Sequence, residues 1–370
     1  MESPRHRFER FETLTLKGIE QMSILITGGT GFIGTRLVSY LANRGERVHV
    51  LGLPTPEMSA SPHPRVRLFL GDILSRRDVD QAMEGCDRVF HLAAYARNWA
   101  PDPQTFYDVN VSGTEIVLSS ALKLGVRRVV HTSSNLTFGP SNGSEVTECT
   151  RRTAPFFTPY EHSKYVAEEL VRKYVQLGLD AVIVNPTRVF GPGPLNESNS
   201  VTKMIAMYVR GSWRLILGNG RMIGNYVFLD DLVRGYDLAM QHGRTGENYI
   251  LGGENVSFNE FFATLAGVAE RNRLLLHLPA LAAMLFSEEE ELRARLLGMY
   301  PLITPGWAQT FLTDWAYSSR RAQLEIGYEI TPLAGALRLT LDWLIRANAV
   351  APFDLERHVA PHLEPMEAIR

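Results

Sequence analysis

A tyrosine and a lysine lie four positions apart in the stretch FFTPYEHSKYVAEELVRKY, residues 156–174. The stretch has the pattern of a helix, on which Tyr160 and Lys164 would share one face. A free tyrosine has a pKa of about 10 and is a poor base at neutral pH. A nearby ammonium favours the phenolate and lowers that pKa. The pair therefore predicts an acid/base tyrosine adjusted by a lysine, with an ordinary surface pair as the alternative.

Two hydroxyls precede this pair, Ser133 and Ser134, at the end of an apolar run. Hydride transfer to a ketone creates an alkoxide that must be protonated, and the reverse reaction must remove the proton of an alcohol. A serine hydroxyl can hold the substrate oxygen beside the phenol. A serine, a tyrosine and a lysine together would thus supply an orienting donor, an acid/base group and its electrostatic partner.

A glycine-rich loop, TGGTGFIG, lies near the start of the chain at residues 27–34. It satisfies both G-x-G-x-x-G and G-x-x-G-x-x-G. Glycines allow a tight turn and let a pyrophosphate approach the N-terminus of the next helix. Between a strand and a helix, the loop predicts a dinucleotide site that includes Thr27, Gly28, Gly31, Phe32, Ile33 and Gly34.

Two further segments extend the predicted cofactor site. Asp72, in the stretch LGDI with Ile73, follows a strand and can accept a hydrogen bond from an adenine amino group, although a helix N-cap is the common role of such an aspartate. The stretch HLAAYA, 91–96, places small residues where a flat cofactor must pass close to the backbone. The residues expected to contact the cofactor there are Leu92, Ala93 and Ala94.

The end of the second predicted strand reads Leu51-Gly52-Leu53. NAD-binding folds usually carry an acid at this place, which holds the ribose hydroxyls and repels a 2′-phosphate. No carboxylate is present, and the reach of the basic residues Arg36 and Arg44 is open at this stage. We therefore expect NADP or NAD as cofactor, with a lean toward NADP.

The elements that would position these residues alternate along the chain. Short apolar runs at 23–27, 47–53, 65–72, 87–94, 127–134 and 179–193 predict strands. Helical patterns separate them and run to about Arg44 and over 76–83, 105–124 and 159–176. Strands alternating with helices predict an α/β fold with a doubly wound parallel sheet, which binds ligands at the carboxyl ends of its strands.

Composition excludes several classes of protein. The 370 residues carry a net charge of −2, which offers no electrostatic footprint for nucleic acid. Two cysteines, Cys86 and Cys149, permit neither a disulfide framework nor a zinc site, so no metal is expected. No secretory signal or membrane-spanning run is present, and we expect a cytoplasmic protein with a small-molecule partner. The apolar run 274–286 has two possible roles, which are a peripheral contact with a membrane surface and a helix that packs over a pocket.

Taken together, the motifs resemble the extended short-chain dehydrogenase/reductases from about Met22 to about Arg346. The segments that carry the resemblance are TGGTGFIG, GDI, FHLAA, VNVSGT, HTSSNLTFG, YEHSK, NPTRVFGPG, NYVFLDDLV and NYILGGE. The resemblance implies a Rossmann-type domain with a smaller C-terminal substrate-binding part. We expect an extension at 1–21 that is poorly ordered, an NAD(P)-binding domain at 22–190, a mainly substrate-binding part at 191–350 with segments that return to the sheet, and a tail at 351–370.

The resemblance also implies roles for single residues. Tyr160 would be the acid/base, and Lys164 would bind the nicotinamide ribose. Ser134 would orient the substrate, with Ser133 as the alternative. Asn110 would brace the active-site segment, and Pro186 would lie beside the nicotinamide. Family members commonly dimerise through the helices expected at 105–124 and 159–176, so a homodimer is expected.

Three functions remain open within this resemblance. The sugar-nucleotide 4,6-dehydratases carry an acidic pair where this chain has Asn135 and Leu136, which disfavours that chemistry. Many nucleotide-sugar enzymes carry a diphosphate-binding arginine where this chain has Gly224, although Arg221 could substitute for it. The stretch GNYVFLDDLV instead resembles the dihydroflavonol-reductase and 3β-hydroxysteroid-dehydrogenase branch. This favours a reductase or dehydrogenase of an apolar molecule, with residues 274–312 as pocket wall or core. A nucleotide-sugar epimerase and a non-catalytic scaffold are the alternatives.

Overall fold

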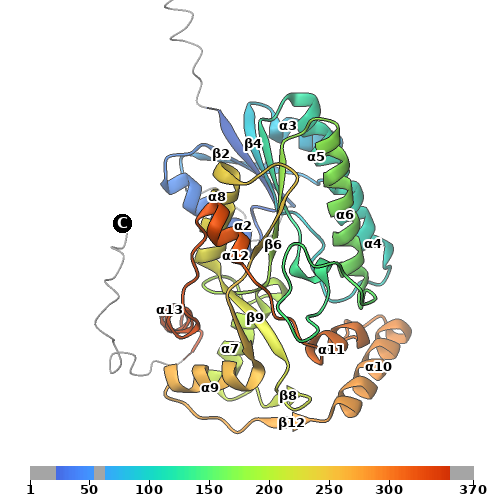
Figure 1. Ribbon diagram of the computed structural model, residues 1–370, viewed down its shortest axis with the longest axis vertical. Coiled ribbons are helices and arrows are strands. Elements are labelled where there is room, and N and C mark those ends of the chain that lie inside the picture. The colour runs from blue at the N-terminus through green and yellow to red at the C-terminus, as the bar shows by residue number, and fades with distance from the viewer. Residues whose placement is uncertain (1–21, 54–62, 351–370) are drawn as a thin grey trace, which may run out of the picture.

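The computed structural model describes residues 22–53 and 63–350, so the expectations for residues 1–21 and 351–370 lie outside the described residues. Within these residues a seven-stranded parallel sheet forms the centre of the molecule, in the order β10-β6-β5-β4-β1-β2-β3 (Figure 1). Its strands are β1 (Ser23–Thr27), β2 (Val48–Gly52), β3 (Val66–Leu70), β4 (Cys86–His91), β5 (Arg128–Thr132), β6 (Ala181–Pro186) and β10 (Asn248–Leu251). The strand order reverses between β1 and β4, which is the Rossmann arrangement. The predicted doubly wound parallel sheet is confirmed.

Helices cover both faces of this sheet, as the pleat of the strands requires. In β1, Ile24 and Ile26 pack with α2 (Phe32–Asn43), α8 (Leu229–His242) and α12 (Arg320–Ile326). The intervening Leu25 packs on the opposite face, with the second helical layer. That layer contains α3 (Arg76–Met83), α5 (Thr114–Leu124) and α6 (Pro159–Gln176). Because both faces are covered, β1 and β6 are buried along their whole length, whereas the edge strand β3 is only partly buried.

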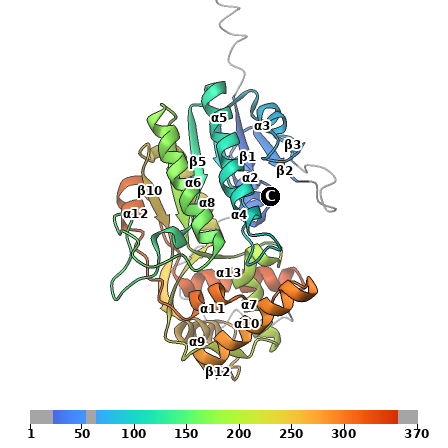
Figure 2. The same cartoon turned by 90° about the vertical axis from the view of Figure 1, so that its right-hand side faces the viewer.

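A smaller part of the chain lies beyond the carboxyl ends of the strands (Figure 2). Its sheets consist of β11-β9-β7 and of β12-β8. Its strands are β7 (Arg188–Phe190), β8 (Leu215–Leu217), β9 (Ile223–Phe228), β11 (Glu254–Ser257) and β12 (Leu276–Leu278). Its helices are α7 (Ser200–Arg210), α9 (Phe258–Val268), α10 (Ala280–Leu297), α11 (Pro305–Phe311) and α13 (Leu333–Arg346), with the 3₁₀ turn η3 (Glu197–Asn199). Another 3₁₀ turn, η2 (Asn135–Phe138), directly follows β5 of the central sheet. The division near residue 190 stays a prediction.

The long helical pattern expected over about 105–124 is confirmed, but the helix is not regular. The structure has α4 (Gln104–Tyr107), a π-helical turn η1 (Asp108–Gly113) and then α5. Gly113 faces the side chain of Ile73 so closely that a Cβ there would lie 2.6 Å from Ile73 Cδ1. The hydroxyl of Thr114 also donates to the carbonyl of Asn110 at 2.7 Å. Such widened turns occur often at functional sites, and this one carries Asn110.

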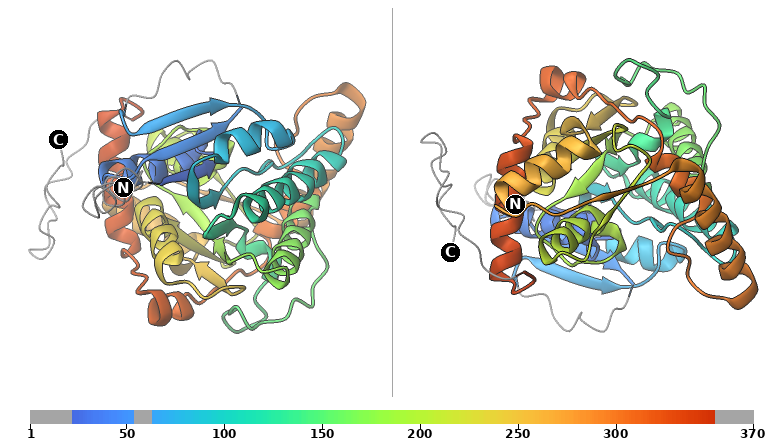
Figure 3. Two further views of the ribbon diagram at one scale, coloured as in Figure 1. Left: turned by 90° about the horizontal axis from the view of Figure 1, so that it is seen from above. Right: turned by 90° about the horizontal axis from the view of Figure 1, so that it is seen from below.

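Residues 274–302 do not form core, which corrects one of the two interpretations left open for that region. Helix α10 stands at the edge of the molecule (Figure 3). Its buried positions hold Ala283, Ser287, Glu290 and Ala294, whereas its large apolar side chains face outward. The exposed ones in this segment are Leu274, Leu276, Leu281, Leu285, Phe286, Leu292, Leu296, Leu297, Met299, Tyr300 and Leu302. Among the described residues, no helix combines the length and apolarity needed to cross a bilayer.

Candidate active site

The glycine loop between β1 and α2 has the shape that a pyrophosphate requires. Gly28 has a φ of +68°, and a Cβ there would lie 2.7 Å from the backbone nitrogen of Ala93. A Cβ on Gly34 would lie 2.2 Å from the carbonyl oxygen of Gly28. No side chain caps the N-terminus of α2, where Gly31 is the N-cap residue. The uncapped backbone N–H groups of this turn, which include those of Phe32 and Ile33, therefore fit a phosphate group.

The other residues predicted to contact a cofactor lie at the carboxyl ends of β4 and β6, which are separated by β5 in the sheet. Leu92 and Ala93 continue β4, and their backbone nitrogens donate to Thr27 O at 3.1 Å and to Thr27 Oγ1 at 3.3 Å. Ala94 comes next along the chain, and Pro186 ends β6. The segment after β4 and the glycine loop after β1 flank the reversal of strand order, which is where ligands bind in open α/β sheets.

Asp72 is not the N-cap of the helix that follows it. Ser75 caps α3 by accepting from the backbone nitrogen of Asp78. Asp72 Oδ1 accepts from the backbone nitrogen of Leu74 at 3.0 Å. Its neighbour Ile73 points inward and is 6% exposed. Asp72 therefore does not have the helix-capping role that is common for such an aspartate, and it stays a candidate for adenine recognition.

The two arginines near the ribose end of this site are engaged elsewhere. Arg36 makes a bidentate ion pair with Asp230, with N–O distances of 2.6 and 2.8 Å. Arg44 donates to the hydroxyl of Tyr40 at 3.0 Å. Neither is held toward the end of β2. In these positions neither arginine is available to bind a 2′-phosphate, so neither supports a preference for NADP.

The side chains of Ser134 and Tyr160 lie near each other. Ser134 follows β5 and caps η2, where its Oγ accepts from the backbone nitrogen of Leu136. Its hydroxyl proton is free, and its interaction with the phenol lowers the pKa of Tyr160. Burial acts in the opposite direction with larger effect and raises the pKa of Tyr160 to about 12. Tyr160 therefore carries its proton at neutral pH in this structure.

Lys164 is buried and lies one turn further along α6. Its Nζ donates to the carbonyl oxygen of Thr132 at 2.6 Å. Burial lowers the pKa of Lys164 to about 8, while the nearby carboxylate of Glu168 opposes that shift. Lys164 is not among the groups that shift the pKa of Tyr160. The lowering of the Tyr160 pKa by Lys164 stays a prediction.

Ser133 has a structural role that makes it a poor alternative to Ser134. Its hydroxyl donates to Glu168 Oε1. The same carboxylate oxygen accepts from Asn185 at 2.7 Å and from Thr137 at 3.0 Å. Ser133 is therefore part of a buried polar network behind the strand, whereas Ser134 contacts the phenol.

Asn110 joins two segments of the site. Its Oδ1 accepts from the backbone nitrogen of Tyr95 at 2.7 Å, and its Nδ2 donates to Ser163 Oγ at 2.9 Å. The hydroxyl of Ser163 donates in turn to the carbonyl oxygen of Tyr160 at 2.9 Å. Asn110 thus holds the segment after β4 against the first turn of α6, which is the bracing geometry expected from the sequence.

Sequence reasoning missed Arg188, which directly follows Pro186 and Thr187. Its guanidinium lies over the rings of Tyr226, Phe258 and Phe311 at 5.3–5.6 Å. Among the described residues no carboxylate pairs with it. A Cβ on Gly224 would lie 2.6 Å from its Nη1. The guanidinium of Arg188 therefore occupies the space beside Gly224, the position at which many nucleotide-sugar enzymes carry an arginine. The sequence indication for Arg188 was its place in the segment NPTRVFGPG.

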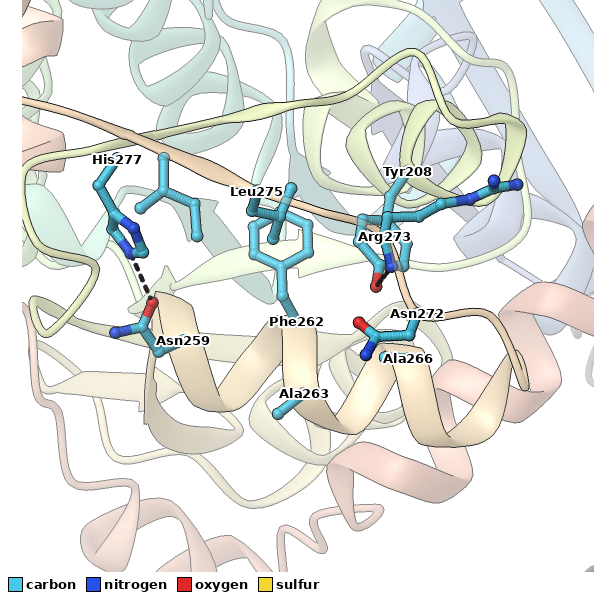
Figure 4. Close-up of a pocket in the computed structure, with 10 residues that line it drawn as sticks. Tyr208, Asn259, Phe262, Ala263, Ala266, Asn272, Arg273, Leu275 and His277 are labelled. Atoms are coloured by element: carbon cyan, nitrogen blue, oxygen red, sulfur yellow. Dashed lines mark hydrogen bonds between the residues drawn. The ribbon is translucent and has the colours of Figure 1, made fainter.

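A separate hollow of about 140 Å³ lies in the smaller part of the chain (Figure 4). Helix α9 forms one side of it, with Asn259 and Phe262, and Tyr208 and His277 lie opposite. His277 is hydrogen-bonded to Asn259 at 3.2 Å. None of the predicted site residues lines this hollow, so the strand-end site is the candidate active site.

Known proteins share both the sequence pattern and the fold. Residues 24–252 match the NAD dependent epimerase/dehydratase family. A putative dihydroflavonol 4-reductase of Synechocystis sp. is 30% identical over 328 residues, which cover 86% of this chain and 93% of that protein. The sterol demethylase protein B of Methylococcus capsulatus is 34% identical over 70% of this chain and 78% of its own length.

Solved structures give the same result for the fold. The crystal structure of gox2253 superposes with a TM-score of 0.76 at 29% identity and covers 89% of this chain and 100% of that one. A UDP-glucose 4-epimerase from Thermotoga maritima superposes with a TM-score of 0.73 at 22% identity, covering 88% of this chain and 100% of that one. The second likeness concerns the fold alone.

Proposed function

The chain belongs to the NAD dependent epimerase/dehydratase family, and we propose that it is a reductase or dehydrogenase of the ketone or secondary alcohol of a fairly apolar small molecule. The NAD(P)-dependent oxidoreductase class follows from the family and its extended short-chain dehydrogenase/reductase relatives. The observation that supports the finer proposal most is the place of Ser134 at the end of β5, where its hydroxyl interacts with the phenol of Tyr160 and lowers its pKa.

A bound nicotinamide would supply or accept the hydride, with the glycine loop holding its pyrophosphate and Lys164 its ribose. In the reducing direction Tyr160 donates its proton to the substrate oxygen. Ser134 donates a hydrogen bond to the phenol oxygen and stabilises the phenolate that remains. Tyr160 carries its proton at neutral pH, as the proton donor of a ketone reduction must.

The surroundings of the phenol support an apolar substrate. Tyr160 packs with Phe157 and Trp307 around a cluster that contains Leu136 and Trp315. Helix α11 contacts the start of α6 so closely that a Cβ on Gly306 would lie 2.2 Å from the carbonyl oxygen of Phe157. We therefore assign residues 305–311 to the wall of the substrate site. The buried Trp307 Nε1 has no partner among the described residues and supplies one donor in this wall.

A second candidate function, nucleotide-sugar epimerisation, is favoured by Arg188. The sequence argument against it rested on Gly224, which has no side chain to hold a diphosphate. Arg188 brings a guanidinium to that place from a neighbouring strand. Guanidinium groups bind phosphate oxygens in bidentate fashion, so the argument from Gly224 is weaker than the sequence suggested.

One assay separates the two functions. Purified protein is given NADH or NADPH with a panel of apolar ketones, and absorbance at 340 nm is followed. The proposal predicts net loss of reduced cofactor. The same protein is incubated with UDP-glucose and catalytic NAD. Formation of an epimer without net cofactor turnover, together with no turnover on any ketone, would replace the first function by the second.

The ribose end of the site supports relaxed cofactor choice. The end of β2 carries no acid that would repel a 2′-phosphate, and Arg36 is paired with Asp230. We propose that NAD and NADP are used with similar efficiency.

We also propose a homodimer through α5 and α6, because Leu122 and Tyr165 expose apolar area on these adjacent helices (Figure 2).

A further inference from the structure

A buried histidine connects the glycine loop with the segment that braces the catalytic helix. His91 ends β4 and is 1% exposed. Its Nδ1 lies 2.7 Å from Thr27 Oγ1, on the strand that enters the glycine loop. Its Nε2 lies 2.9 Å from Thr114 Oγ1, at the start of α5. One imidazole thus bridges two elements on either side of the predicted cofactor site.

The neighbouring bonds assign the tautomer of this imidazole. Thr114 donates its only hydroxyl proton to the carbonyl oxygen of Asn110 at 2.7 Å, so it must accept from His91 Nε2–H. Thr27 Oγ1 accepts from the backbone nitrogen of Ala93, and its own proton is free for His91 Nδ1. Burial, with a smaller effect from the charge of Lys164, lowers the pKa of His91 to about 3 and keeps the ring neutral.

With this assignment the hydrogen bonds run in one direction through the site. The backbone of Ala93 donates to Thr27, Thr27 to His91, His91 to Thr114, and Thr114 to the backbone carbonyl of Asn110. A second series starts at the side chain of Asn110, whose Nδ2 donates to Ser163, and Ser163 donates to the carbonyl oxygen of Tyr160. Each donor in the series has an acceptor, so the series leaves none of its buried protons unsatisfied. Hydrogen bonds that follow one another in this way polarise each other and rigidify their segments.

A second buried histidine provides a contrast. His131 lies on the adjacent strand β5, is fully buried, and has its ring centroid 5.3 Å from that of His91. Neither of its nitrogens has a partner among the described residues. The two rings share burial and surroundings, but only His91 is part of the series.

We propose that His91 is a positioning residue, which fixes the distance between the cofactor loop and the acid/base Tyr160 through Thr27 on one side and Thr114 and Asn110 on the other. The inference rests on the proposed function for the identity of the acid/base. Its structural content, a hydrogen-bonded connection between residues 92–95 and the first turn of α6, is independent of that function.

The matched pair His91→Phe and His131→Phe tests the connection. Both replace a buried ring by a buried ring, but only the first removes hydrogen bonds. We expect His91→Phe to accelerate amide exchange about tenfold in two separate peptides, one covering 92–97 and one covering 158–164. His131→Phe should change neither. Equal changes in both variants, or a change in 92–97 alone, would overturn the proposal.

Two polar variants separate the two halves of the connection. An asparagine at 91 can accept from Thr27 but does not reach Thr114, whereas a glutamine can donate to Thr114 but leaves Thr27 without its acceptor. We expect His91→Asn to keep the dissociation constant for NADH within about twofold and to lower kcat about tenfold or more. His91→Gln should weaken NADH binding more than it lowers kcat. Should either variant affect both quantities equally, His91 is only a packing residue.

The same experiments distinguish this proposal from the proposed function. If Tyr160→Phe keeps wild-type turnover, the acid/base assignment fails, yet the exchange pattern of His91→Phe still decides whether the connection exists. If Tyr160→Phe abolishes turnover and both histidine variants exchange alike, the connection fails and the acid/base assignment stands. Should His91→Phe not fold, the exchange pattern is measured on His91→Asn, which keeps a polar side chain; unchanged exchange of 158–164 in that variant would also overturn the proposal.

Discussion

The ammonium of Lys164 is hydrogen-bonded to the carbonyl oxygen of Thr132 at 2.6 Å, inside the protein and against the end of β5. The hydroxyl of the same threonine accepts from Tyr236 at 2.9 Å. Lys164 therefore approaches the sheet, while Tyr160, one helical turn earlier, pairs with Ser134. The two residues share a helix face as their spacing predicts, but each has a different partner.

Replacing Lys164 with methionine should stabilise the fold at neutral pH. Burial lowers the lysine pKa from 10.5 to about 8, so the folded protein binds its proton more weakly than the unfolded chain. The resulting cost, about 3 kcal/mol at pH 7, is relieved as pH rises from 8 to 10.5. Urea unfolding of wild type and Lys164→Met should therefore differ at pH 7 and converge near pH 10.5. An equal gap at both pH values contradicts the buried ammonium.

The pH dependence of alcohol oxidation should reveal the Ser134 bond. Oxidation requires the phenolate of Tyr160, so its rate should rise with pH. Ser134→Ala removes the bond that lowers the Tyr160 pKa and should move this rise to higher pH. Ser133→Ala is the matched control, since the hydroxyl of Ser133 is bound to Glu168 and its loss should leave the midpoint of the pH profile unchanged.

Tyr160→Phe should lower kcat about 10³-fold, because it removes the acid/base group. An oxidation rate that is flat between pH 6 and 10 in all variants would remove Tyr160 from the reaction.

The sequence predicted the fold well because its signals are local. Central strands such as β1 are buried on both faces and therefore have apolar sequences, and the glycine loop has a steric requirement that few other turns share. The site was predicted to the level of residue types and strand ends. What the sequence could not show is where long side chains go. Arg36 reaches Asp230, which is 194 positions away in the chain, and no spacing rule indicates such a partner.

The same limit explains the remaining differences. The π-helical turn at 108–113 depends on the contact of Gly113 with Ile73 from another strand end. The direction of the Tyr160 pKa depends on burial, which the helical spacing of Tyr160 and Lys164 does not encode. The place of Arg188 beside Gly224 joins two strands of the smaller sheet, β7 and β9. Each of these features is tertiary, and each alters the chemistry predicted from local pattern.

An arginine at the end of β2 should create a preference for NADP. Leu53 is 58% exposed there, and hydrogen bonds to a charged group contribute about 1.5–3 kcal/mol. We expect Leu53→Arg to lower the KM for NADPH about tenfold and to leave that for NADH nearly unchanged. Leu177→Arg, at an equally exposed leucine just after α6, is the control. An equal effect of both variants would indicate a general charge effect and not a ribose contact.

A charge on α5 should separate the proposed dimer. Leu122 is 37% exposed on this helix, and Leu324 is 74% exposed on α12. If α5 and α6 form the interface, Leu122→Glu places a charge in an apolar contact and should yield monomers in sedimentation velocity at micromolar concentration. Leu324→Glu should leave the dimer intact. A wild-type protein that sediments as a monomer would end the dimer proposal.

Arg188 should decide whether the substrate carries an anionic group. Its guanidinium is stacked on three aromatic rings, donates to Tyr226 at 3.3 Å and has no carboxylate partner among the described residues. A phosphate or carboxylate on the substrate would supply that partner, and loss of a charged hydrogen bond costs about 1.5–3 kcal/mol. Arg188→Gln should then raise the KM for an anionic substrate at least tenfold and leave the KM for a neutral ketone within about twofold. Arg214→Gln changes an exposed arginine just before β8 and serves as the control. Equal KM values for Arg188→Gln and wild type on both substrate classes would show that the guanidinium only packs against the rings, and the argument for a nucleotide-sugar substrate would lose its one structural support.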